Sequence, residues 1–379
     1  MLPAESLAFL VLLASCFVLD VGVPLLHFER YHKYLIENLL MQTKIKPVTP
    51  ESVAEAKQII FDGGVVAMPT ETVYGLGGNA FDDEAVKRIF EVKGRPNDNP
   101  LIAHVHLDYD LSKIIDYDPP YAKKLREAFL PGPLTLVYPS KGKVSPYVSC
   151  GLDTLAVRVP AHEGAQTFLK AVDIPIVAPS ANLSKHVSPT TAMHVFEDFD
   201  GKIPLILDGG TCVGGIESTV CDVTGDIPVI LRPGLITRAM IADVVGACEE
   251  YTPNLEKGEK VKSPGVLYKH YSPRCETLLF TEEELEEAFA ACARVKLEGK
   301  RVIALCEEKY VVLFQQAGIQ TLNLGKTESE MAYRLYELLR EAEKSCDVLV
   351  TIEPKDSGGV MTGVLNRLRK ACKSTDIQH

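Results

Sequence analysis

The hydrophobic and polar positions of this chain divide it into two regions with different patterns. Between residues 44 and 245, short apolar runs typical of buried strands are followed by polar, glycine-rich or cationic segments. From residue 276 onward, apolar runs of strand length alternate regularly with segments that repeat apolar residues at helical spacing. The polar, irregular stretch 246–275 separates the two regions. The pattern therefore predicts two α/β domains joined by a linker.

Individual helices and strands follow from the spacing of apolar residues and from cap and breaker residues. In the first region we expect helices at 49–62, 121–129, 164–172 and 236–245, and strands at 65–68, 101–105, 134–138, 154–159, 174–178, 205–207, 217–220 and 229–231. In the second region we expect strands at 277–280, 302–305, 321–324 and 348–352, and helices at 282–297, 328–345 and 360–371. Such alternation implies a small parallel α/β domain at the C-terminal end.

The stretch 64–100 has the clearest local organisation. An apolar strand at 65–68 is followed by a polar, glycine-rich segment over 70–78, which we expect to form a turn. Asp82 or Asp83 is the expected N-cap of the helix that comes next. A strand, a small-residue loop and a helix thus lead in order to a basic helix end.

Two cations separated by a single glycine, Lys93 and Arg95, end this helix. Arginine offers phosphate a planar fork of donors and lysine offers a compact charge, so the pair is a candidate phosphate site. The alternative is that the helix dipole alone favours cations at this end. Arg158 and Arg232 support an anion site, because each ends an apolar strand and arginine is rarely buried without a partner.

Neutral hydrogen-bonding side chains lie at or beside other predicted strands. Ser180 and Asn182 come directly after one strand, Ser218 opens another, and His104 lies within a third. Such groups can bind a nucleotide or an amino acid. The alternative is structural: the serines and the asparagine can cap a helix or turn, and the histidine can be bonded to a neighbour within the fold. No base is visibly paired with these serines, so nucleophilic serine catalysis is disfavoured.

Two glycine-rich segments resemble phosphate loops without completing their motifs. The segment 75–80 fits GxGxxA, but a dinucleotide fingerprint needs an acidic residue about twenty positions later. This chain has Arg95 there. The segment 209–215 lacks the GK[ST] ending of a Walker A loop. We therefore interpret both segments as turns that use the conformational freedom of glycine.

The composition bears on two questions: whether the protein binds nucleic acid and in which cellular compartment it works. The chain has 379 residues, 46% of them hydrophobic, and a formal net charge of -11. An acidic protein of this kind is a poor candidate for binding nucleic acid over a broad surface. The ten cysteines are scattered singly, without a CxxC pair or zinc spacing. Reduced thiols in a cytoplasmic protein are the expectation.

The first forty residues carry an apolar run at 7–19 that is interrupted by Ser15. A membrane span needs about twenty apolar residues, and a secretory signal needs a basic lead that 1–6 lacks. A translation start at Met41 is one interpretation of this extension, and a membrane anchor or a secreted protein are the others. We expect no membrane contact and place 1–43 outside the folded domains.

Eight short motifs occur in one order along the chain: PTETVYGL, KGRPNDNPL, LPGPLT, GLDTLAVRVP, APSANLS, ESTV, LRPG and SPGVLYKHYSP. As an ordered set they closely resemble the threonylcarbamoyl-AMP synthase (YrdC-like) family in its longer two-domain form. The resemblance implies an open, twisted α/β sheet with a large cavity and a smaller, Rossmann-like parallel α/β domain. It divides the chain into an extension (1–43), a catalytic domain (44–245), a linker (246–275) and a C-terminal domain (276–379).

The resemblance also implies an activity. The expected enzyme is a nucleotidyltransferase that makes threonylcarbamoyl-AMP from L-threonine, bicarbonate and ATP and releases pyrophosphate. Its product would pass to a tRNA threonylcarbamoyl transferase complex, which modifies the adenosine beside the anticodon. Mg²⁺ would accompany the phosphates of ATP, although no protein ligand can be named. Such a transfer needs positioning and charge neutralisation more than a protein nucleophile, which suits cationic and hydroxyl side chains.

Carried over motif by motif, the resemblance assigns roles to individual residues. The family's KxR and SxN signature, taken as catalytic, corresponds to Lys93, Arg95, Ser180 and Asn182. Threonine contacts fall to Thr72, His104, Arg158 and Ser218. ATP contacts fall to Arg95, Asn99, Thr154, Ser180, Ser188, Arg232 and Tyr271. Because Tyr271 belongs to the linker, the pattern implies that the linker closes over the nucleotide as a lid. Lys185 and Leu267 depart from the usual pattern outside the signature positions.

Two other functional classes stay open on the sequence alone. One is an RNA-binding or translation-factor module that contacts double-stranded RNA or tRNA without adenylylation. The acidic total charge and the lack of an aromatic and basic stripe count against it. The other is a carbamoyl transferase of the hydrogenase-maturation type, which carries a related domain. Its acylphosphatase-like and zinc-finger segments do not appear in this sequence.

Overall fold

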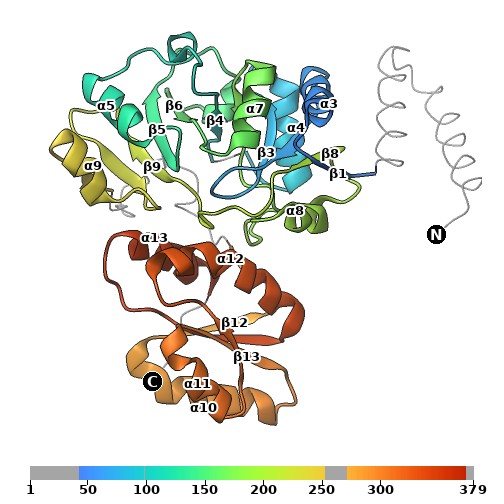
Figure 1. The fold of residues 1–379 in the computed structure, drawn as a ribbon, viewed down its shortest axis with the longest axis vertical. Helices are drawn as coiled ribbons and strands as arrows, with labels where there is room; N and C mark the ends of the chain where they lie inside the picture. The colour runs from blue at the N-terminus through green and yellow to red at the C-terminus, as the bar shows by residue number, and fades with distance from the viewer. Residues whose placement is uncertain (1–41, 98, 252–270, 373–379) are drawn as a thin grey trace, which may run out of the picture. The chain divides into compact units, whose positions relative to one another are not determined.

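The strands of the first region join into one mixed sheet. The computed structural model describes residues 42–97, 99–251 and 271–372 (Figure 1). Its first sheet has eleven strands in the order β1-β8-β2-β3-β7-β4-β6-β5-β9-β10-β11. The strands are β1 (Lys44–Pro47), β2 (Val66–Met68), β3 (Gly75–Asn79), β4 (Ile102–His104), β5 (Leu134–Pro139), β6 (Thr154–Arg158), β7 (Ile176–Val177), β8 (Leu205–Asp208), β9 (Thr219–Asp222), β10 (Val229–Arg232) and β11 (Glu249–Glu250). Every strand predicted for this region is present.

The helices of this region pack on both faces of the sheet. They are α3 (Pro50–Phe61), α4 (Asp83–Lys93), α5 (Pro120–Phe129), α6 (Pro146–Ser149), α7 (Glu163–Val172), α8 (Ala192–Phe199) and α9 (Arg238–Val245), with a short 3₁₀ turn, η1 (Leu111–Lys113). Ile60 of α3 and Phe168 of α7 belong to the apolar core on one face, whereas Ile89 of α4 belongs to the larger core on the other. Thr49 caps α3, and Asp82, one of the two predicted N-cap residues, caps α4.

The prediction of a turn over 70–78 is wrong for its second half, and so is the interpretation of 75–80 as a turn. Gly75–Asn79 forms strand β3, which pairs antiparallel with β2. Glycine is needed there for close packing: a Cβ at Gly77 would lie 2.7 Å from Cγ2 of Ile176. A strand can therefore be rich in glycine where a neighbouring side chain approaches its backbone. In the segment 209–215, by contrast, Gly210 and Gly215 adopt positive φ, as the turn interpretation requires.

The C-terminal segment, residues 276–372, forms the predicted parallel sheet. Its strands, in the order β12-β15-β13-β14, are all parallel. They are β12 (Glu276–Phe280), β13 (Val302–Cys306), β14 (Gln320–Asn323) and β15 (Val348–Ile352). The helices are α10 (Leu285–Leu297), preceded by the 3₁₀ turn η3 (Glu282–Glu284), α11 (Glu308–Gln316), α12 (Glu328–Ser345) and α13 (Val360–Ala371). Helices α10 and α11 cover one face of this sheet, and α12 and α13 cover the other (Figure 1).

The sheet register brings polar strand ends together. Strands β4 and β6 are parallel neighbours, and their last residues, His104 and Arg158, are direct partners. Thr135 of β5 lies opposite Arg158, and β5 pairs in parallel with β9, the strand that follows Ser218. These contacts place polar residues from separate parts of the sequence together at one end of the neighbouring strands β4, β6, β5 and β9.

The predictions for 1–41 and for 252–270 concern residues outside those that the structure describes. Within the described ranges, no helix combines the length and the apolar character that a membrane span requires.

Candidate active site

A cavity lies where several strands of the first sheet end. Its empty volume, which includes open solvent at its mouth, is about 720 Å³. Most of the predicted site residues line it: Arg95, His104, Arg158, Ser180, Asn182, Ser218, Arg232 and Tyr271. The structure therefore brings together both groups of predicted substrate contacts, those for threonine and those for ATP.

His104 is a buried, neutral imidazole at the end of β4. Its Nδ1 lies 3.1 Å from the carbonyl oxygen of Ile102. A carbonyl only accepts hydrogen bonds, so the neutral ring carries its proton on Nδ1 and leaves Nε2 unprotonated. Burial lowers the pKa of His104 to about 3, and the neighbouring Arg158 adds to this effect.

Acid is expected to destabilise the fold through His104. The unfolded chain binds this proton at an ordinary pKa of 6.5, and the folded protein binds it at about 3. Between these values the unfolded state holds more protons, so the free energy of unfolding decreases as the pH falls below 6.5. Chemical denaturation at a series of acidic pH values should show that the free energy of unfolding falls more steeply with decreasing pH for the wild type than for His104→Gln. Identical slopes would contradict the neutral, buried state of His104.

Arg158 lines the cavity as half of a buried ion pair. Its Nη2 lies 2.8 Å from Oε1 of Glu71, and both side chains are at least nine-tenths buried. Its Nε also donates to the carbonyl oxygen of Gly132 at 3.4 Å. These partners fix the guanidinium at the end of β6, beside His104.

Arg232 and Ser218 connect the two groups of predicted contacts directly. Nε and Nη2 of Arg232 donate to the carbonyl oxygen of Ser218 at 3.1 and 2.9 Å, and Nη2 also lies 3.2 Å from its hydroxyl. The Ser218 hydroxyl lies 2.8 Å from that of Thr135 on β5. Arg232, a predicted ATP contact, is therefore hydrogen-bonded to Ser218, a predicted threonine contact.

Lys93 shapes the loop between β7 and α8. Its Nζ donates to the carbonyl oxygens of Ser180 and Asn182, each at 2.5 Å. The side chain is buried and does not line the cavity. Burial lowers the pKa of Lys93 well below its usual range, and Arg95 adds to this shift. In this geometry Lys93 supports the loop that carries Ser180 and Asn182, and its contact with phosphate stays a prediction.

Four further predicted residues are buried but do not line the cavity: Thr72, Asn99, Thr154 and Ser188. The Thr72 hydroxyl lies 2.9 Å from that of Thr70, which does line the cavity. The backbone carbonyl of Asn99 accepts from Nη2 of Arg95 at 3.1 Å. The substrate contacts assigned to these four residues stay predictions.

Sequence reasoning missed Glu217, whose side chain lines the cavity and is largely buried. Its carboxylate accepts from Ser188 at 2.7 Å, from the Tyr336 hydroxyl at 2.8 Å and from Nε of Arg367 at 3.1 Å. Burial alone would raise the pKa of Glu217, but Arg367 and Arg232 bring it down to about 2. The glutamate belongs to the motif ESTV, so its position beside Ser218 was an available signal.

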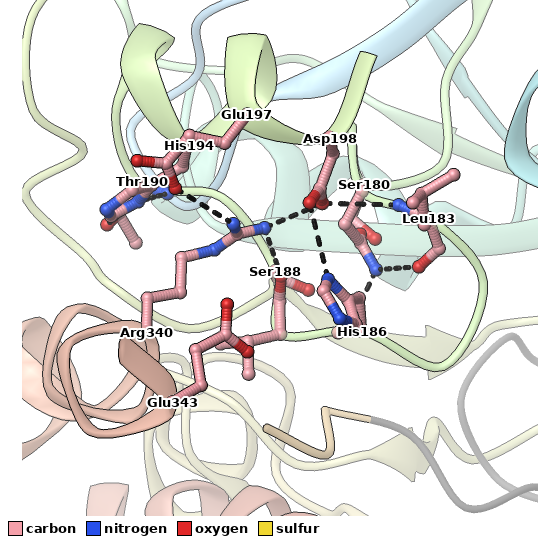
Figure 2. A network of polar contacts seen from close by, with 12 residues as sticks. Ser180, Leu183, His186, Ser188, Thr190, His194, Glu197, Asp198, Arg340 and Glu343 are labelled. Carbon is pink, nitrogen blue, oxygen red and sulfur yellow. Dashed lines mark hydrogen bonds and ion pairs between the residues drawn. The ribbon is translucent and has the colours of Figure 1, made fainter. Parts of the chain in front are cut away.

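A second buried cluster holds the loop between β7 and α8 (Figure 2). Nη2 of Arg340, on α12, donates to Oδ2 of Asp198 at 2.8 Å and to the Val187 carbonyl at 2.6 Å. Asp198 also lies 3.3 Å from Nδ1 of His186 and accepts from the backbone N–H of Leu183. Burial would raise the pKa of Asp198, but His186 and Arg340 bring it to about 2. A side chain of the C-terminal segment, Arg340, thus helps to hold this loop.

Comparison with known proteins identifies the family. The family model described as "Telomere recombination" (Sua5_yciO_yrdC) matches residues 58–234, and the model described as "Threonylcarbamoyl-AMP synthase, C-terminal domain" matches 236–372. The threonylcarbamoyl-AMP synthase of Pyrococcus abyssi is 42% identical over 323 residues, which cover 83% of this chain and 92% of that protein. The chain belongs to the threonylcarbamoyl-AMP synthase family. The Bacillus subtilis threonylcarbamoyl-AMP synthase is 39% identical over 320 residues, covering 84% of this chain and 92% of that protein.

The fold agrees with this threonylcarbamoyl-AMP synthase assignment. A crystal structure of P. abyssi Sua5 complexed with L-threonine matches with a TM-score of 0.79 and 40% identity. The match covers 88% of this chain and 97% of that one. The expectation of a YrdC-like sheet with a cavity, followed by a parallel α/β segment, is confirmed.

The carboxylate that lines the cavity, Glu217, and the one paired with the lining residue Arg158, Glu71, are both held by arginines. Glu71 is paired with Arg158 and Glu217 with Arg367. Among residues 42–97, 99–251 and 271–372, no group of three His, Cys, Asp or Glu side chains could hold a metal ion. These residues do not fit a magnesium site made of protein ligands.

Proposed function

We propose that the chain is a nucleotidyltransferase that converts L-threonine, bicarbonate and ATP into threonylcarbamoyl-AMP and pyrophosphate. The observation that carries this proposal is the shared cavity. Residues assigned to threonine, such as Arg158 and Ser218, line it together with residues assigned to ATP, such as Arg95 and Arg232. The family membership and the likeness to a threonine-bound Sua5 structure support the same assignment.

The chemistry needs two bond-forming steps. The threonine amine adds to carbon dioxide, which bicarbonate supplies by losing hydroxide, and releases a proton as the carbamate forms. A carbamate oxygen then attacks the α-phosphorus of ATP, and the bond to the β-phosphate bridging oxygen breaks as pyrophosphate leaves. The guanidinium groups of Arg95, Arg158 and Arg232 offer positive charge to the carboxylate and the phosphates. Positioning and charge neutralisation of this kind can account for catalysis without a protein nucleophile.

The remaining partners follow from this activity. Mg²⁺ would neutralise part of the phosphate charge and would be held by ATP oxygens and water, as is usual where it serves nucleotide phosphates. A downstream tRNA threonylcarbamoyl transferase complex would use the product, and the cytoplasm is the expected location.

Pyrophosphate release is expected to require all three substrates. The full chain is incubated with ATP, L-threonine and bicarbonate, and each is omitted in turn, with carbon dioxide excluded from the buffer when bicarbonate is left out. We expect pyrophosphate only in the complete mixture and a low yield when serine replaces threonine. Release without threonine would indicate simple ATP hydrolysis. No release, together with salt-dependent tRNA binding, would favour an RNA-binding module instead.

A further inference from the structure

Two helices of the C-terminal segment lie against two loops, the one that leads to Ser218 and the one that follows Arg232. A Cβ at Gly215 would lie 2.2 Å from the carbonyl oxygen of Ala332, on α12. A Cβ at Gly363, on α13, would lie 3.2 Å from Cα of Gly234. Glycine at 215 permits a backbone contact that a Cβ would prevent, and a Cβ at 363 would require its neighbours to shift by a few tenths of an ångström, so the helices and the loops fit closely.

Arg367, on α13, connects the two loops. Its Nε donates to the Glu217 carboxylate at 3.1 Å, and its Nη2 donates to the Glu217 carbonyl oxygen at 3.2 Å. Its Nη1 donates to the carbonyl oxygen of Pro233. One planar guanidinium therefore bonds both to the residue before Ser218 and to the residue after Arg232.

Tyr336, on α12, completes the junction. Its hydroxyl donates to the Glu217 carboxylate at 2.8 Å. Its ring stacks on that of Tyr271, with centroids 5.4 Å apart, and Tyr271 lines the cavity. Both Tyr336 and Arg367 are fully buried. Neither side chain lines the cavity, so each would act through residues that do.

We infer that Arg367, assisted by Tyr336, is a positioning residue for the substrate cavity: through Glu217 and Pro233 it supports the direct contact between Ser218 and Arg232. This inference rests on the proposed function. The C-terminal segment then has a role in binding substrates, because its side chains bond to the residues on either side of the direct contact between Arg232 and Ser218. Paired, hydrogen-bonded charges in a dry site are well suited to fix geometry.

The test compares three variants of the full chain. Arg367→Lys keeps the positive charge but loses the planar fork of donors. Tyr336→Phe keeps the ring that stacks on Tyr271 and loses the hydroxyl. Arg369→Met is the matched control, because Arg369 lies on the same helix, is exposed, pairs with Glu353 and does not line the cavity. For each protein, pyrophosphate release gives kcat and the KM values for threonine and ATP, and thermal unfolding gives stability.

We expect Arg367→Lys to raise the KM for both substrates by about tenfold, since small displacements of positioning groups have effects of this size or larger. Tyr336→Phe should raise them less, and Arg369→Met should match the wild type. A merely structural role gives a different result: partial unfolding lowers the apparent kcat and leaves KM unchanged, because KM does not depend on enzyme concentration.

Unchanged KM values in folded Arg367→Lys would overturn the inference. If that variant does not fold, unchanged KM values in Tyr336→Phe would overturn it as well. The wild type separates this outcome from failure of the proposed function. A wild type that releases no pyrophosphate would refute the function and the inference with it, whereas an active wild type with an unaffected variant refutes only the role of Arg367.

Discussion

Replacing Arg232 by methionine is expected to lower kcat/KM for pyrophosphate release by roughly 100-fold or more, since each charge-assisted hydrogen bond lost is worth about 1.5–3 kcal/mol. The guanidinium holds the Ser218 carbonyl through two hydrogen bonds and faces the cavity. Its loss would remove the proposed partner of a phosphate and would also release the Ser218 carbonyl. Both effects act on the assembled substrates, so the expected defect is larger than that of an arginine with one partner.

The matched control is Arg238→Met. Arg238 begins α9, is exposed, and donates to the carbonyl oxygen of Cys248 at 3.5 Å, outside the cavity. This variant should keep wild-type kinetics. Steady-state rates of both variants, measured at several ATP and threonine concentrations, make the comparison. Wild-type kcat/KM in Arg232→Met would show that Arg232 does not contact the reacting groups.

Replacing Arg158 by methionine is expected to destabilise the fold by about 3–5 kcal/mol, the usual cost of breaking one side of a buried ion pair. Glu71 would keep its carboxylate in a largely buried site without the guanidinium 2.8 Å away. The loss of stability comes from the unpaired charge of Glu71. The double variant Arg158→Met/Glu71→Gln should therefore recover most of the lost free energy of unfolding. Urea unfolding of the three proteins measures these differences.

Arg301→Met is the control for this second prediction. Arg301 pairs with Asp347, but both side chains are well exposed, and exposed ion pairs contribute little to stability. The decrease in the free energy of unfolding should therefore be much smaller for Arg301→Met than for Arg158→Met. Equal losses for the two single variants, or no recovery in the double variant, would contradict the account of a buried pair between Arg158 and Glu71.

Most helices and strands could be predicted from the sequence, because the spacing of apolar residues within each element is enough to indicate it. Helices α12 and α13 match the predicted ranges 328–345 and 360–371, since both carry apolar residues at helical spacing. Helix α11 was not predicted: its run of tyrosine, valine, leucine and phenylalanine over 310–314 lacks a polar face and is equally typical of a strand. Strand β3 was missed for a related reason, because its glycines serve a contact with a distant residue, Ile176.

The cavity could be predicted only in part. Arg158 and Arg232 were identifiable, because an arginine at the end of an apolar strand implies a buried partner. Which residues meet across the sheet depends on its register, for example His104 opposite Arg158. The contribution of Arg367 lies beyond any local pattern, since it contacts Glu217 from a position 150 residues later in the chain.

The central claim is that one cavity joins threonine, as its carbamate, to the adenylyl group of ATP. Mass spectrometry of a reaction that contains ¹³C-bicarbonate tests it most directly. We predict a labelled product that contains threonine, one carbon from bicarbonate and AMP, formed in equal amount to the pyrophosphate released. An unlabelled threonine–AMP adduct, or pyrophosphate without any labelled adduct, would contradict the claim.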